Sequence, residues 1–236
     1  HGYEGTGRGF EVRFRAVLDR RTPDWRGLRL ETPIRWVQGD PLERLIDDAL
    51  LLDAEPAPAA EIIARLTECG PAGIVCERLH RDRLAADDAL LRQVFGLLVL
   101  GHYQTRPADL RLMLDAPNIE VVVLRAAKPQ PGEPTPSAKC VGSRGDPSGA
   151  SVTRGPILAT ALVAAEGRLE ADLVEPIFAG RRRPHGHLLP QTLSAHGGLF
   201  DAPRLAYARI LRIAVHPAAR RRGFGRRLVG AVRQRA

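Results

Sequence analysis

The stretch from Arg209 to Ala236 constrains the fold more than any other part of this sequence. An apolar run over residues 209–215 ends at His216-Pro217. The turn Arg220-Arg-Arg-Gly-Phe-Gly-Arg226 and a helical pattern to the end of the chain follow. A strand that runs into a glycine turn and a helix presents free backbone N–H groups at the positive end of the helix dipole. This arrangement suits a pyrophosphate, so we expect an anion site at a strand–helix junction.

The charge distribution indicates a polyanionic partner. The chain of 236 residues carries a formal net charge of +8, and clustered arginines are typical of proteins that bind nucleic acid. Residues 209–236 contain many arginines and no acidic residue, and residues 181–183 are a second cluster. The alternative for either cluster is a solvated, arginine-rich surface.

The cysteines and the hydropathy pattern place the chain in a broad class. Cys69, Cys76 and Cys140 match no close-spaced metal pattern, so we expect reduced cysteines, no disulfide, no zinc site and a cytoplasmic location. No apolar run reaches the length of a membrane span. The chain begins at His1 and shows no secretory signal. We interpret it as a fragment of a longer protein.

Residues 1–52 form the first block of the pattern. A glycine-rich loop over residues 1–9 precedes the alternating residues 10–18, which predict a half-buried strand. A second short strand is expected near residues 28–30. Asp40-Pro41 is typical of a helix start, and residues 53–59, with two prolines and three alanines, indicate a linker.

The second block alternates helices and strands, which predicts α/β or α+β layering. Residues 128–156 are rich in Pro, Gly and Ser and indicate a flexible insertion. The expected elements are helices over about 84–100, 107–115 and 169–178, and strands over 119–124, 157–164 and 209–215.

Several motifs together resemble one enzyme family. The spacing Arg-x-x-Gly-x-Gly at Arg220–Gly225 resembles the acetyl-CoA signature of GNAT acetyltransferases. The wider set is similar to the tRNA(Met) cytidine acetyltransferases, in order and over nearly the whole chain. The motifs are Gly2-Tyr-Glu-Gly-Thr-Gly-Arg-Gly-Phe10, Pro33-Ile-Arg-Trp36, His102-Tyr-Gln-Thr-Arg-Pro-Ala-Asp-Leu110, Met113-Leu-Asp-Ala-Pro117, Gly180-Arg-Arg-Arg-Pro184, Gln191-Thr-Leu-Ser-Ala-His-Gly197 and Arg212-Ile-Ala-Val-His-Pro217.

The resemblance implies an α/β fold in which the end of a RecA-like, helicase-type ATPase domain precedes the first part of a GNAT fold. The implied boundaries are 1–52 for the ATPase part, 53–60 for a linker and 61–236 for a truncated GNAT domain. The implied reaction is ATP-dependent acetylation of N4 of the wobble cytidine of elongator tRNA(Met), with acetyl-CoA as co-substrate. The phosphate loop that would bind ATP and Mg²⁺ is absent from this sequence, so we expect the chain alone to be inactive.

The resemblance also assigns roles to single residues. Backbone groups of the strand would hold the pantetheine arm, and the turn would hold the pyrophosphate of acetyl-CoA. Arg35 and Arg8 would contact ATP, and Arg181, Arg182 and Arg183 would contact RNA phosphates. The residues implied to bind acetyl-CoA are Ile213, Ala214, Val215, Arg220, Arg221, Arg222, Gly223, Phe224, Gly225 and Arg226.

The sequence does not assign the general base. An exocyclic cytosine amine is a poor nucleophile, so the enzyme must align it with the thioester, polarise the carbonyl and remove a proton. The candidates for the proton transfer are His102, His185, His187, His196 and His216.

Two other functions remain open at this stage. One is a GNAT enzyme that acetylates a protein or a small amine. The other is an RNA-binding module with a decayed acetyltransferase fold. The motifs in the first 52 residues argue against the former, and the intact glycine turn argues against the latter.

Overall fold

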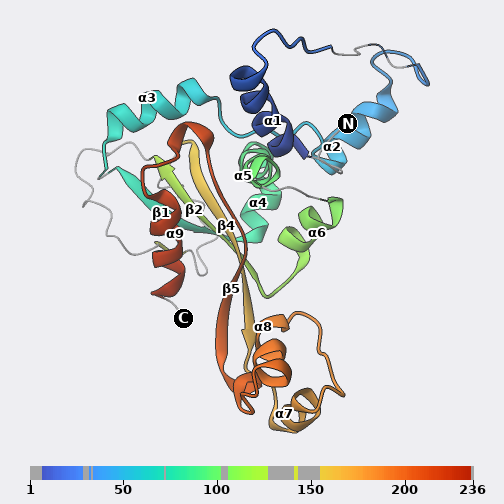
Figure 1. The fold of residues 1–236 in the computed structure, drawn as a ribbon, viewed down its shortest axis with the longest axis vertical. Coiled ribbons are helices and arrows are strands. Elements are labelled where there is room, and N and C mark those ends of the chain that lie inside the picture. Colours follow the sequence, from blue (N-terminus) through green and yellow to red (C-terminus); the bar gives the residue numbers. More distant parts are fainter. Residues whose placement is uncertain are drawn as a thin grey trace.

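The computed structural model describes residues 7–28, 32, 34–71, 73–101, 106–126, 141–142 and 155–234, without the side chains of residues 7–13 and 141–142. A mixed sheet with the strand order β3-β1-β2-β4-β5 forms its centre (Figure 1). Every neighbouring pair is antiparallel except β1 and β3, which are parallel. The strands are β1 (Ile74–Leu79), β2 (Ile119–Ala126), β3 (Val141–Gly142), β4 (Ile157–Gly167) and β5 (Ala206–Val215).

The three strands expected in the second block of the sequence are confirmed, and each is longer than its apolar run. β2, β4 and β5 extend the predicted ranges 119–124, 157–164 and 209–215. β4 is buried along almost its whole length, as a central strand should be. β1 was not predicted from the sequence. Its apolar residues are separated by Cys76, Glu77 and Arg78.

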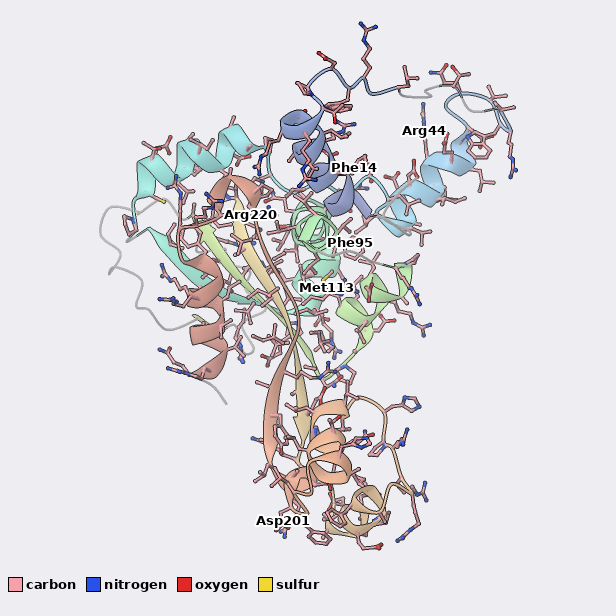
Figure 2. All side chains as sticks on the ribbon, viewed as in Figure 1. Phe14, Arg44, Phe95, Met113, Asp201 and Arg220 are labelled. Atoms are coloured by element: carbon pink, nitrogen blue, oxygen red, sulfur yellow. The ribbon has the colours of Figure 1, made fainter. Side chains whose placement is uncertain are left out.

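Helices cover both faces of the sheet and create two hydrophobic cores. α3 (Ala59–Cys69) and α9 (Phe224–Arg233) pack on one face, where Ile62, Leu124 and Leu228 are buried. α4 (Arg81–Ala86), α5 (Asp88–Gly101) and α6 (Pro107–Asp115) cover the other face, around Phe95 and Met113 (Figure 2). The predicted helix over 107–115 is confirmed at both ends.

β4 and β5 continue beyond the rest of the sheet and carry a small helical unit, which we call the arm (residues 166–207; Figure 1). The carboxylate of Glu166 is fully buried at its base. It accepts hydrogen bonds from Arg209 of β5 and from the backbone N–H of Leu189, the latter at 2.7 Å. The arm contains α7 (Ala171–Phe178), α8 (Leu188–Gln191), a π-helical turn (Thr192–His196) and a 3₁₀ turn (Ala202–Arg204).

The N-terminal block differs from its prediction. α1 (Gly7–Arg21) replaces both the strand predicted over residues 10–18 and the end of the glycine-rich loop. The prediction failed because positions 10, 14 and 18 fit a period of two and also lie on one face of a helix. α2 (Pro41–Leu50) begins as expected, with the Asp40 carboxylate accepting from the Leu42 N–H at 2.7 Å.

The segment between α2 and α3 is irregular, as a linker should be, but it is packed into the protein. Ala54 and Ala57 are buried. The backbone of Glu55 crosses α5 so closely that a Cβ on Gly96 would lie 2.6 to 2.8 Å from it. A glycine is therefore needed at position 96 for this crossing.

The cysteines correct one expectation. Cys76 is disulfide-bonded and Cys69 is free. The sequence analysis expected three reduced thiols. Within the described ranges no helix could cross a membrane, and no cluster of metal-ligating side chains occurs. Most of the insertion expected over residues 128–156 lies outside the described residues.

Candidate functional site

The C-terminal half of β5 has one free edge. β5 pairs only with β4 in the described part of the sheet, and Leu211 has no partner because Leu162 faces Arg212 and Val163 faces Ile210. This irregularity is a β-bulge. The N–H of His216 donates to Leu158 of β4 at 2.8 Å. Hydrogen-bonding directions alternate along a strand, so the backbone groups of Ile213 and Val215 face the free edge.

The strand continues into a turn with two left-handed residues. A 3₁₀ turn (Pro217–Ala219) leads to Arg221, with φ of 62°, and Gly223, with φ of 80°. Gly223 is the N-cap of α9 and offers no side chain for capping. The first backbone N–H groups of α9 therefore lack an intrahelical or capping partner and lie at the positive end of its dipole. Arg221 is one of few non-glycine residues in this strained conformation.

Both glycines of the turn leave room beside the backbone. A Cβ on Gly223 would meet nothing within 4 Å, and one on Gly225 would meet only a methyl group of Val215, at 3.7 Å. Packing within the described protein therefore does not require a glycine at position 225. Free space and free amides at one place are what a bound phosphate needs.

The arginines of the turn divide into two kinds. Arg220, Arg221, Arg222 and Arg226 are exposed, and none has a carboxylate partner in the part of the chain that the structure describes. Arg227 instead points inward and donates to the carbonyl of Ile74, and burial lowers the pKa of its guanidinium. Phe224 likewise packs against the core. Four arginines without a carboxylate partner among the described residues thus belong to the same turn as the free amides.

His216 is held in this arrangement by hydrogen bonds to the backbone. It is buried, its Nδ1 accepts from the Ala218 N–H at 3.2 Å, and its Nε2 lies 2.9 Å from the carbonyl oxygen of Ala57. An Nδ1 that accepts leaves the proton on Nε2, which then donates to Ala57. Burial lowers the pKa of the imidazole, so it is held neutral. Both ring nitrogens are engaged, so His216 is a poor candidate for the general base.

The other histidines are not gathered at the turn. His187 and His196 belong to the arm, where the Nδ1 of His187 accepts from the Gly167 N–H at 2.9 Å. His185 is exposed on the same unit. His102 lies outside the described residues, directly after the last residue of α5. The general base therefore stays unassigned.

The end of α5 touches β5 beside the turn. A Cβ on Gly101 would lie 2.6 Å from the Cβ of Ala214, so the glycine lets the helix end against the strand. Arg212 of β5 is tied to Asp109 of α6 at 2.7 Å. Neither contact could be predicted from the sequence, because each joins residues about a hundred positions apart. Small residues at 101 and 214 were the only signal.

The three arginines of the arm have different surroundings. Arg181 forms an ion pair with Glu175, whereas Arg182 and Arg183 have no acidic partner in the described part of the arm. Arg182 and Arg183 instead line a hollow of about 100 Å³. Its other lining residues are Ile177, Gly180, Leu188, Gln191, Thr192, Ala195 and His196.

Arg35 and Arg8 lie in the N-terminal block. Arg35 is exposed on an irregular segment between α1 and α2, and Arg8 is in α1, with its side chain outside the description. Neither is part of the turn. A larger cavity, of about 320 Å³, lies at the base of the arm and is lined by Glu166, Tyr207 and Val232, among others, but by no residue of the turn.

The fold and the turn together define a GNAT-type acetyltransferase. Residues 93–235 match the family model for GNAT acetyltransferase 2, and the chain belongs to this family. Residues 1–53 match the model for the helicase domain of RNA cytidine acetyltransferase NAT10/TcmA. The α/β fold with a helicase-domain end before a GNAT domain is thereby confirmed, and so is the family resemblance found in the sequence.

Curated relatives match the chain along nearly its whole length. A tRNA(Met) cytidine acetyltransferase TmcA of Nitrosococcus halophilus is 50% identical over 232 residues, which are 98% of this chain and 27% of the relative. The TmcA of Haloarcula marismortui is 38% identical over 233 residues, 99% of this chain and 26% of the relative. That of Yersinia pestis is 36% identical, over 98% and 28% respectively. The chain thus spans about a quarter of these proteins.

Proposed function

We propose that this chain is part of an enzyme that transfers an acetyl group from acetyl-CoA to N4 of the wobble cytidine of elongator tRNA(Met), in an ATP-dependent reaction. The observation that carries the proposal is the junction of β5 and α9. It combines free edge groups, free helix amides, two glycines with open space and four arginines that have no carboxylate partner among the described residues. The names of the relatives supply the acceptor.

The junction can bind acetyl-CoA in two parts. The backbone edge of Ile213 and Val215 offers hydrogen bonds to the amides of the pantetheine arm. The N–H groups of Phe224, Gly225 and Arg226 face the pyrophosphate, and Arg220, Arg221 and Arg222 add positive charge around it. Ala214 contributes through its small side chain, which lets α5 approach β5. This part of the chain binds and orients the donor.

The arm supplies a place for RNA. We assign RNA phosphates to Arg182 and Arg183, whose guanidinium groups border one hollow and have no acidic partner in the described part of the arm. Arg181 is already neutralised by Glu175 and so contributes less. The π-helical turn next to the hollow is of a kind often found at functional sites.

The nucleotide belongs to the N-terminal block. Arg35 is exposed and free to reach a phosphate, and Arg8 is the second candidate in that block. The described residues hold no phosphate loop, so most contacts to ATP and Mg²⁺ would come from other parts of the enzyme. A tRNA substrate would place the enzyme in the cytoplasm.

The donor site is tested by Gly225→Glu in the full-length protein. The new Cβ fits the fold, but the carboxylate would occupy the phosphate position and repel the anion. We expect acetyl-CoA affinity to fall at least tenfold, about 1.4 kcal/mol, with tRNA affinity retained, as measured by calorimetry. Gly230→Glu is the matched control, because Gly230 lies in the same helix and a Cβ there would meet nothing within 4 Å. Equal affinity in both variants would contradict the proposed donor site.

The RNA site is tested by comparing Arg182→Ala and Arg183→Ala with Arg181→Ala. Each removed phosphate contact should weaken tRNA binding and lower the slope of log affinity against log salt by about one. We expect this for positions 182 and 183 and a smaller change at 181. The same loss of tRNA affinity at all three positions would contradict the role of Glu175. No loss of tRNA affinity at any of them would contradict an RNA site on the arm.

A further inference from the structure

A short segment, residues 48–57, links the end of the helicase-type part to the turn that we assign to acetyl-CoA. It begins in the last turn of α2 and ends before α3. It is irregular from residue 51 on, yet Leu51, Ala54 and Ala57 are buried. Three separate contacts fix its path.

The first contact is an arginine that gathers three carboxylates. Arg92 of α5 lies 2.8 Å from Asp48, 2.6 Å from Asp53 and 2.7 Å from Asp88. Hydrogen bonds to Asp88 and Asp53 raise the pKa of the guanidinium, which stays charged. The carboxylates are 58 to 70% exposed, so each pair contributes little energy. The network therefore fixes the position of the start of the segment and adds little to the stability of the protein.

The second contact is the crossing of the segment over α5. The backbone of Glu55 lies against Gly96 with no room for a side chain. A backbone that touches a helix at this distance cannot slide along it without losing the fit. The segment is therefore held at its middle as well as at its start.

The third contact reaches the turn itself. The carbonyl oxygen of Ala57 accepts from the Nε2–H of His216, and the Nδ1 of His216 accepts from the N–H of Ala218. This imidazole is the N-cap of the 3₁₀ turn over residues 217–219, and Arg220 follows directly. One side chain thus joins the end of the segment to the start of the pyrophosphate turn, across 159 positions of sequence.

We propose that His216 is a positioning residue that couples the acetyl-CoA turn to the helicase-type part through the segment 48–57. A displacement of this segment moves the carbonyl of Ala57. The imidazole follows, and with it the backbone that leads into Arg220 and Gly223. Nucleotide bound to the helicase-type part then changes acetyl-CoA affinity, and acetyl-CoA changes nucleotide affinity by the same factor. This inference rests on the proposed donor site.

The experiment measures acetyl-CoA affinity by calorimetry in the full-length protein, with and without a non-hydrolysable ATP analogue. In the wild type we expect the analogue to change the dissociation constant at least fivefold, the lower end of ordinary coupling. His216→Asn keeps an acceptor near the Nδ1 position but cannot reach Ala57. We expect this variant to bind acetyl-CoA within about threefold of the wild type and to lose the effect of the analogue.

Two further variants keep the test decisive. His216→Gln can still donate toward Ala57, so it should retain part of the nucleotide effect. Arg92→Lys keeps the charge but cannot hold three carboxylates, so it should reduce the effect without touching the turn. His80→Asn is the matched control, since the Nδ1 of His80 caps α4 in the same way at an exposed site, and it should behave as the wild type.

The outcomes separate this inference from the proposed function. No acetyl-CoA binding in the wild type would overturn the donor site itself. Acetyl-CoA binding that is indifferent to the analogue, or an analogue effect that survives in both His216→Asn and Arg92→Lys, would overturn the coupling and leave the donor site standing. A melting temperature that falls in His216→Asn, with the analogue effect unchanged, would reduce His216 to a purely structural residue.

Discussion

α2 and α5 both carry apolar side chains along a helix, but the structure treats them in opposite ways. α2 buries none of its residues, and Leu42, Leu45 and Ile46 are between 42 and 63% exposed and belong to neither core. α5 buries its side chains from Leu90 to Val99 almost without interruption. The change occurs near Leu51, beside the end of the helicase-domain match at residue 53. The GNAT part thus carries its own core, and α2 shows an apolar face that lacks a partner in the described ranges.

The largest expected effect separates these two regions by stability. Phe95→Ala should lower the free energy of unfolding of the 236-residue chain by about 3–5 kcal/mol, because it empties a fully buried site. Leu45→Ala should change it by less than about 0.5 kcal/mol, because most of that side chain is in water. Denaturant unfolding of the two variants gives the comparison. Similar losses in both would mean that α2 belongs to the same cooperative core as α5.

A smaller effect tests the contact that crosses the boundary. Gly96→Ala places a methyl group where the backbone of Glu55 lies, so the segment must shift. We expect a loss of about 1–3 kcal/mol in unfolding free energy, the usual range for overpacking.

The control for this contact is Gly230→Ala in α9, which points into open space. Removing a helical glycine there should stabilise the chain by up to about 1 kcal/mol. Opposite signs at the two glycines would confirm the close crossing. A gain at both would show that the segment 48–57 is free to move away from α5.

The smallest effect depends on pH. The folded-state pKa of His216 is lowered, so its contribution to stability is complete above the ordinary pKa of about 6.5 and is lost as pH falls through the folded value. Unfolding of the wild type and of His216→Asn should be measured at pH 7.5 and at pH 5. The advantage of the wild type should shrink at pH 5, by at most about 1.4 kcal/mol for each unit of lowering. The positive charge of Arg220 lowers the pKa of the His216 imidazole further. An advantage that grew at low pH would mean that the imidazole is protonated in the fold.

Local signals predicted elements well where a cap or a buried run marked them. Asp40-Pro41 and Pro107 begin helices as expected, and the apolar runs at 119, 157 and 209 are strands. The turn at 220–225 could be found because its parts adjoin in sequence. The alternation over residues 10–18 misled, because every second apolar position there also fitted a helical stripe.

Contacts between distant residues could not be read from the sequence. His216 before Pro217 suggested only the end of a strand, and nothing local indicates that Ala57 meets it. The bulge at Leu211 and the left-handed Arg221 depend on how β5 pairs and where the chain must turn. The assignments to acetyl-CoA, ATP and RNA stay predictions until binding is measured.

The long β4–β5 pair has a geometric consequence. β5 has ten residues, from Ala206 at the arm to Val215 at the turn, and a strand rises about 3.3 Å per residue, so the two ends lie about 30 Å apart. The pair connects them with one bulge, at Leu211, and the ion pair between Arg209 and the buried Glu166 stiffens its far end. If the arm holds RNA and the turn holds the donor, β5 fixes the distance between these two sites. The enzyme would then choose its nucleotide partly by the distance from a site that it never modifies.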